Sequence, residues 1–268
     1  MALAATLHDP TAALYREVVW ALPRLRALYG GGIVATTSPP TSPRLVGLLR
    51  AEGVFGGAPR TNTRGPLYRM AIRGAVAKGA PVVHYLDFDR ALHWMHVAPR
   101  ELAAVLRLAH RYPAVIVGRT EQAHASHHRP LWATEGVANC LMADALGVRG
   151  RLDLLVPSML LASPIARALV TASRARDTDV YGEWAALVPA LAPVLAYVEC
   201  RGLDWETPDR FRHAVRRIGL AAWRRQQETA AEWTLRIALA DTIITSFTRQ
   251  HARRPARPRL VRVPRRGA

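Results

Sequence analysis

The sequence predicts an α/β protein with a mostly parallel central sheet, because short apolar strands alternate with helices along most of the chain. Strands are expected at residues 33–37, 81–86, 114–117, 152–156 and 196–200. Helices are expected at residues 12–28, from Ser42, at 66–78, from Pro99, at 131–146 and at 229–250. Helical crossovers connect parallel strands, and ligands of such sheets bind at the carboxyl ends of the strands.

The chain is long enough for one domain, with 268 residues of which 50% are hydrophobic. We expect a single catalytic domain over residues 1–251, with a leading helix within residues 1–30 and further helices over residues 207–251. The run Thr207-Pro208-Asp209 offers a cap, a first-turn proline and an acid to the first of these C-terminal helices. Residues 252–268 are rich in arginine and proline and lack acids, which predicts a disordered tail.

The formal net charge of +17 would ordinarily suggest nucleic acid or an anionic membrane as a partner. However, Lys78 is the only lysine, and such a preference for arginine is typical of a GC-rich genome. The isolated Cys140 and Cys200 argue against a disulfide scaffold and favour a reducing cytoplasm. No apolar run reaches the ~20 residues of a spanning helix. We expect a cytoplasmic protein with no transmembrane segment, whose basic tail could touch the inner membrane face.

Asp87 and Asp89 are the first candidates for chemistry, because they follow a predicted buried strand. In an extended segment positions i and i+2 point to the same side, which leaves Phe88 to face the core. Two carboxylates placed in this way repel each other unless a cation joins them. Mg²⁺ or Mn²⁺ binds carboxylate oxygens and keeps positions open for substrate phosphates. The alternative is that the pair only caps the following helix.

Residues 61–135 resemble bacterial glycosyltransferase family 2-like proteins of the GT-A fold, a three-layer α/β/α architecture with extra helices at both termini here. The matching segments are Arg73-Gly74-Ala75, His84-Tyr85-Leu86-Asp87-Phe88-Asp89-Arg90 with Trp94, and Val117-Gly118-Arg119-Thr120-Glu121. Weaker matches are Asp179 with Glu183-Trp184, and Gly202-Leu203-Asp204-Trp205-Glu206. The resemblance implies transfer of a sugar from a nucleotide-diphosphate donor, assisted by a metal at the Asp-x-Asp loop.

The resemblance also implies roles for the loop after the first expected strand. Thr36, Thr37 and Ser38 would receive the nucleotide base and ribose, although a turn and helix cap would use the same residues. Asp87 and Asp89 would bind the metal-diphosphate. Independently of the resemblance, Arg119 ends an apolar strand and could clamp a phosphate, or it could pair with Glu121.

Sugar transfer with inversion needs a carboxylate base to take a proton from the acceptor hydroxyl. Asp179 and Glu183 are the candidates, since a helix would place them on one face, and the alternative is a solvated acidic turn. The histidines at 124, 127 and 128 lack the usual spacing of metal ligands, so an ordinary polar loop is favoured over a metal site. The acceptor-side residues 151–158 lack an expected glycine-rich turn, which leaves donor, acceptor and stereochemistry open. An inactive homologue, or a basic protein that binds nucleic acid or anionic lipid, is the alternative.

Overall fold

The computed structural model describes residues 1–155 and 158–264, and within them one eight-stranded sheet forms the centre of the molecule. Its strands are β1 (Ala2–Leu7), β2 (Ile33–Thr37), β3 (Phe55–Gly57), β4 (Val82–Asp87), β5 (Ala114–Arg119), β6 (Ser158–Ala162), β7 (Val194–Cys200) and β8 (Arg259–Arg262). They lie in the order β3-β2-β1-β4-β6-β5-β7-β8. Only β6 runs antiparallel to its neighbours β4 and β5, so the predicted mostly parallel sheet is confirmed.

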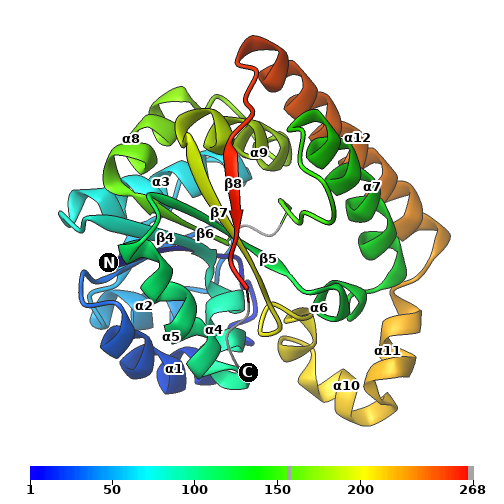
Figure 1. The fold of residues 1–268 in the computed structure, drawn as a ribbon. Coiled ribbons are helices and arrows are strands. Elements are labelled where there is room, and N and C mark those ends of the chain that lie inside the picture. Colours follow the sequence, from blue (N-terminus) through cyan, green and yellow to red (C-terminus); the bar gives the residue numbers. More distant parts are fainter. Residues whose placement is uncertain (156–157, 265–268) are drawn as a thin grey trace.

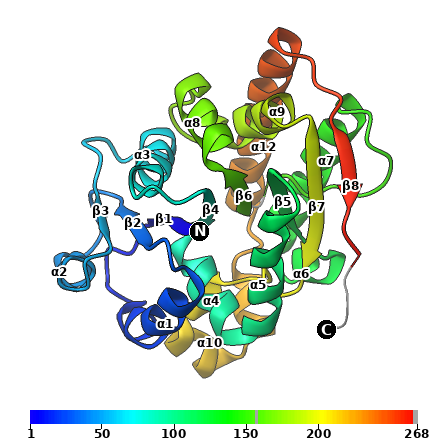
Figure 2. The same ribbon diagram turned by 60° about the vertical axis from the view of Figure 1, so that its left-hand side comes forward.

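Helices cover both faces of this sheet and give the predicted three layers (Figure 1). One face packs against α1 (Tyr15–Leu28), α2 (Pro43–Ala51), α4 (Phe88–Val97) and α5 (Pro99–Leu106), with Trp94 fully buried. The other packs against α3 (Arg64–Ala77), α7 (Arg129–Ala145), α8 (Ser163–Ala172), α9 (Asp179–Leu191) and α12 (Ala230–Arg253). Figure 2 shows the two groups on opposite sides of β1 and β4. None of the helices in the described ranges is both long and apolar enough to cross a membrane.

The sequence prediction contains no strand before the leading helix, which it placed at residues 12–28. Ala2–Leu7 instead forms the central strand β1, buried along its whole length between the parallel neighbours β2 and β4. Its alanines and leucines have high helix propensity, so no β-branched run marked it as a strand. Burial on both faces overrides that propensity, and only Tyr15–Leu28 is helical.

The strand expected at residues 152–156 is also wrong. Residues 152–155 have no regular structure, and residue 156 lies outside the described residues. The strand lies further along, at Ser158–Ala162, where Leu160 pairs with both His84 and Val115. An antiparallel strand between parallel ones cannot be recognised from the local sequence, because its orientation depends on the distant strands that it joins.

The C-terminal region differs from the prediction in two places. The first C-terminal helix was expected to begin at Thr207. A 3-10 turn forms there instead, at Thr207–Asp209, and two short helices follow it, α10 (Arg212–Ile218) and α11 (Leu220–Gln226). Gly219 separates them with a φ of 81°, a conformation that L side chains rarely adopt. The tail is not wholly disordered either, because β8 pairs in parallel with β7 at the sheet edge. Residues 265–268 lie outside the described residues.

Candidate functional site

A cavity of about 410 Å³ opens at the carboxyl ends of β1, β2 and β4. The chain runs outward from β1 to β2 and β3 and then returns to β4 on the other side of β1, so the strand order reverses here. Such a switch point is where open α/β sheets bind ligands. The cavity is lined by Thr6, Leu7, His8, Ser38, Pro59, Thr61, Asn62, Thr63, Arg64, Leu67, Tyr68, Asp87, Asp89, Tyr181 and Arg210.

Asp87 is the last residue of β4 and its carboxylate lines the cavity. Thr6 of the neighbouring β1 donates a hydrogen bond of 2.6 Å to its Oδ1. Burial and the nearby charge of Asp89 raise the Asp87 pKa to about 7, although Arg90 lowers it. Asp87 therefore carries a proton or a negative charge in comparable amounts near neutral pH.

Asp89 lies in the first turn of α4, one helical residue beyond the fully buried Phe88. Both aspartates line the same cavity, but the backbone between them is a strand-to-helix junction and not the extended segment that the sequence predicted. The Oδ2 atom of Asp89 lies 3.0 Å from Nη2 of Arg210. The next residue, Arg90, pairs at 3.4 Å with Glu206, so two arginines flank the aspartate loop.

The two aspartates fit a divalent cation only as part of its coordination shell. Within the residues that the structure describes, no three His, Cys, Asp or Glu side chains are grouped as a metal site. Mg²⁺ is commonly held by one or two carboxylates and completed by water and substrate phosphates. The raised pKa of Asp87 indicates that the carboxylates disfavour joint ionisation, which a bound cation would reverse. The pair therefore fits a metal that arrives with a phosphate ligand.

Ser38 is the only member of the predicted base-and-ribose loop among the residues that line the cavity. Its Oγ lies 2.7 Å from Nδ1 of His8 and 3.0 Å from Oγ1 of Thr41. Thr36 and Thr37 are buried within β2, and Thr36 Oγ1 has no hydrogen-bond partner in the described part of the chain. The structure thus brings Ser38 to the aspartates but leaves Thr36 and Thr37 inside the sheet.

Two arginines that sequence reasoning missed also line the cavity. Arg64 begins α3, and Arg210 follows the 3-10 turn after β7. Burial, followed by these two arginines, lowers the pKa of His8, which keeps its imidazole neutral at pH 7. Arg210 is paired with Asp89 at 3.0 Å, and Arg64 is paired with Asp177 at 2.8 Å. An anion in the cavity would therefore bind to guanidinium groups that already contact a carboxylate. No sequence signal marks Arg210, which reaches the site through a loop whose path depends on the tertiary fold.

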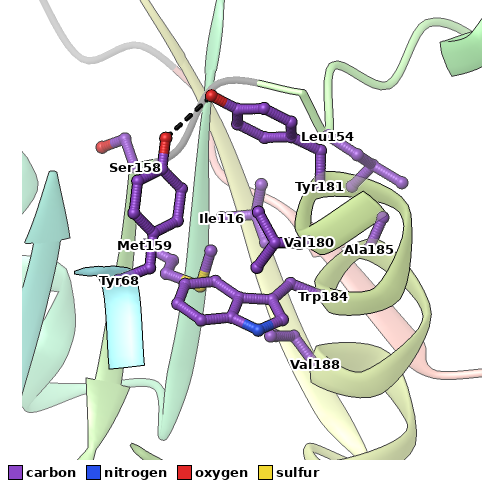
Figure 3. Close-up of a pocket in the computed structure, with 10 residues that line it drawn as sticks. All are labelled: Tyr68, Ile116, Leu154, Ser158, Met159, Val180, Tyr181, Trp184, Ala185 and Val188. Carbon is purple, nitrogen blue, oxygen red and sulfur yellow. Dashed lines mark hydrogen bonds between the residues drawn. The ribbon is translucent and has the colours of Figure 1, made fainter. Parts of the chain in front are cut away.

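A second, much smaller pocket lies directly beside the cavity and shares Tyr68 and Tyr181 with it. Figure 3 shows the two tyrosine hydroxyls meeting at 2.8 Å, with Trp184 beneath them. This pocket has a volume of about 20 Å³ and apolar walls, so it holds no more than a water molecule. It provides a rigid aromatic support for the cavity and is not itself a ligand site.

Arg119 does not reach the cavity, and the expectation that it clamps a phosphate is corrected. Its guanidinium is fully buried and contacts Asp153 through Nε at 2.7 Å and Nη2 at 3.0 Å. Glu135 of α7 accepts a further bond of 2.5 Å, so Glu121 is not the partner. Asn139 donates to the same Asp153 carboxylate. These residues form a structural ion network that connects β5, α7 and the segment before β6.

Asp179 and Glu183 are likewise not brought to the cavity, which corrects their assignment as the proton acceptor. Asp179 accepts backbone N–H bonds from Arg176 and Asp177 at the start of α9. Glu183 is buried and accepts bonds from the Ser173 hydroxyl and the Arg174 and Ala175 N–H groups. The helical spacing was predicted correctly, but both carboxylates hold the loop between α8 and α9.

We therefore predict that Glu183→Ala destabilises the protein without weakening ligand binding at the cavity. The substitution leaves three donors of the α8–α9 loop without an acceptor, which should lower the unfolding free energy by about 3 kcal/mol. Chemical denaturation measures the loss, with the exposed Glu121→Ala as control. If the Glu183→Ala protein were as stable as the wild type but no longer bound ligand, Glu183 would be a residue of the binding site.

The three histidines after β5 are buried and do not form an open polar loop. Their Nε2 atoms approach three different carboxylates, namely Glu135 for His124, Glu206 for His127 and Glu232 for His128. Burial lowers the pKa of His127 well below its ordinary value, with Arg119 and Arg90 adding to the effect. His127 and His128 therefore contact carboxylates of the C-terminal segments, whereas His124 contacts α7.

His93 of α4 contacts Asp204 at 2.8 Å and Asp209 at 2.7 Å, which fastens the loop that carries Glu206 and Arg210. Burial alone would lower its pKa, but the two hydrogen-bonded carboxylates raise it to about 9. The pKa of His93 in the unfolded state is about 6.5, so this stabilisation is complete below pH 6.5 and is lost as the pH rises through 9.

We predict that His93→Gln lowers the unfolding free energy by about 2 kcal/mol at pH 6 and by much less at pH 10. Denaturation at both pH values tests this, and an equal cost at both would contradict it.

Comparison with known proteins adds no family to this description. No protein-family model matches the chain, and no curated protein matches its sequence. The function proposed below therefore depends on the cavity and on the residues that line it.

Proposed function

We propose that the protein is a glycosyltransferase that binds a nucleotide-diphosphate sugar in the cavity at the ends of β1, β2 and β4. The observation that carries the proposal is the position of Asp87 and Asp89, which face one cavity at the switch point of the sheet. The volume of about 410 Å³ lies within the range of small-molecule sites. The acceptor is not specified by these residues.

Different sides of the cavity suit different parts of such a donor, namely its diphosphate and its nucleoside. A Mg²⁺ or Mn²⁺ ion held by Asp87 and Asp89 would neutralise the departing nucleoside diphosphate. Arg210 and Arg64 line the same cavity in ion pairs with Asp89 and Asp177, and their remaining N–H groups would bind phosphate oxygens. On the β1–β2 side, the neutral His8 and Ser38 offer the hydrogen-bonding groups that a ribose or base requires.

The residues that line the cavity also limit which groups can act as the catalytic base. Asp87 and Asp89 are the only acids among the residues that line the described cavity, since Asp179 and Glu183 serve the α8–α9 loop. For sugar transfer, the proton of the acceptor hydroxyl must therefore be taken up by a side chain that lines the cavity or by a group of the acceptor itself. A protein that binds the donor without transferring the sugar is the alternative, and turnover separates it from the enzyme.

Thermal unfolding with a panel of UDP-, GDP- and dTDP-sugars in Mn²⁺ tests the proposal. We expect at least one donor to raise the melting temperature, and Arg210→Ala to weaken that donor's binding by about tenfold. Arg60→Ala, at an exposed position outside the cavity lining, is the matched control. If no donor stabilises the wild-type protein, the proposed function is wrong.

A further inference from the structure

Residues 210–227 form one of two segments in the C-terminal region that are basic and contain no acid. They include six arginines and His213 but no aspartate or glutamate. The segment folds as α10 and α11, which project at the lower right of Figure 1, beyond the layers that cover the sheet. Its position at one end of the molecule makes this charge accessible to a large partner.

The outer surface of these helices combines apolar and cationic side chains. Phe211 is 49% exposed and Leu220 is 50% exposed. Phe211 also packs against the buried Trp223, with ring centroids 5.4 Å apart, and Trp223 packs in turn against Trp205. Three arginines are exposed and form no ion pair within the described residues, namely Arg216, Arg217 and Arg225. We call these five outward residues, Phe211, Arg216, Arg217, Leu220 and Arg225, the α10–α11 surface.

We propose that the α10–α11 surface docks the protein on an anionic lipid bilayer. Interfacial helices place apolar side chains at the boundary between headgroups and acyl chains while arginines contact anionic lipids. The exposed phenylalanine and leucine beside unpaired arginines match this pattern, whereas binding to a nucleic acid backbone requires only the charge. The charge complementarity and the exposed apolar pair therefore favour a membrane over a nucleic acid.

The proposed bilayer contact adjoins the candidate site. Arg210 lines the cavity and contacts Asp89, and the α10–α11 surface begins at the next residue, Phe211. A bilayer on this surface would lie near the cavity mouth, where a lipid-linked acceptor could enter. This part of the inference rests on the proposed function, but docking itself does not depend on it.

The C-terminal tail is the other basic segment, and it lies at the edge of the sheet, apart from α10 and α11. Residues 259–262 are held as β8 against β7 at the sheet edge. The exposed Arg254 and Arg257 precede that strand and provide a charge-matched comparison for Arg216 and Arg217. If the bilayer contacts α10 and α11, substitution of Arg216 and Arg217 should weaken vesicle binding, whereas substitution of Arg254 and Arg257 should not.

Flotation of the full chain with vesicles tests the proposal, using phosphatidylcholine with 30% phosphatidylglycerol against phosphatidylcholine alone. We expect binding only to the anionic vesicles, weakened by salt. Since each arginine near such a surface strengthens binding roughly fivefold, Arg216→Glu with Arg217→Glu should weaken it at least about thirtyfold. Arg254→Glu with Arg257→Glu should change it little.

A second pair of variants separates membrane insertion from charge alone. Phe211→Ser with Leu220→Ser should weaken vesicle binding about tenfold or more. Leu235→Ser with Ile237→Ser, equally exposed on α12, should not. The proposal would be overturned if vesicle binding were lost only with the Arg254 and Arg257 variant, or if it were unchanged in both α10–α11 variants. Binding to duplex DNA in place of vesicles would overturn it as well. Donor binding measured on the same variants should stay at the wild-type level, so that failure of docking is distinguishable from failure of the proposed function.

Discussion

Asp87→Asn should make the protein more stable above pH 7, although it removes a residue from the centre of the candidate site. The folded pKa of Asp87 is about 7 and the unfolded value is 3.8, so the folded state holds the proton more tightly. Wild-type stability therefore falls as the pH rises from about 4 to 7 and stays reduced above that range. The uncharged amide avoids this loss, and we expect a gain on the order of 3 kcal/mol at pH 8.

Denaturation with urea at pH 4 and pH 8 measures this effect, with the exposed Asp144→Asn as the control. The gain should be small at pH 4, because Asp87 is protonated in the folded state and the pH lies close to the unfolded pKa of 3.8. Thr6 can still donate its hydrogen bond to the amide oxygen, so this contact does not explain the difference. Destabilisation by Asp87→Asn at pH 8 would show that the carboxylate is structural.

Asp153→Ala should produce the largest loss of stability in the protein. Asp153 is fully buried, and the Arg119 guanidinium beside it holds the Asp153 pKa well below its usual range. Removing the carboxylate leaves the Arg119 guanidinium with Glu135 as its acceptor and leaves the Asn139 side-chain N–H group without the acceptor that it has in Asp153. Loss of one partner of a buried ion pair costs about 3–5 kcal/mol.

The double variant Arg119→Met with Asp153→Leu is the control for this loss. Replacing both charges by apolar side chains removes the unpaired cation but also takes the guanidinium partner from Glu135. The double variant should therefore recover part of the stability lost in Asp153→Ala. Nucleotide-sugar binding should also survive in the double variant, because neither residue lines the cavity. If the double variant is folded but does not bind any donor, Arg119 acts at the site after all.

The sequence was sufficient for the fold class, because strands such as residues 33–37 and 196–200 carry local β-branched or apolar signals. It was insufficient for β1, whose Ala-rich sequence resembles a helix, and for β6, whose orientation depends on distant partners. The tail shows the same limit. Arginine and proline suggest disorder in β8, but pairing with β7 at the sheet edge supplies order that composition does not encode.

The candidate site was predictable where the residues follow strand ends. Asp87 ends β4, Asp89 lies two residues further in α4, and Ser38 follows β2, so their convergence follows from a parallel sheet. Asp179 and Glu183 were misassigned because helical spacing shows which residues share a face but not what that face contacts. Arg210 could not be found, since a loop held by His93 brings it to Asp89 from far along the chain.

Calorimetry with the donor that stabilises the protein tests the central claim most directly. At pH 8 we expect wild-type protein to bind this nucleotide sugar in the presence of Mn²⁺ and much more weakly without it. Asp87→Asn and Asp89→Asn should each lower the affinity at least about a hundredfold while remaining folded. Binding that is equally tight without the metal, or in both variants, would contradict a metal-diphosphate site at Asp87 and Asp89.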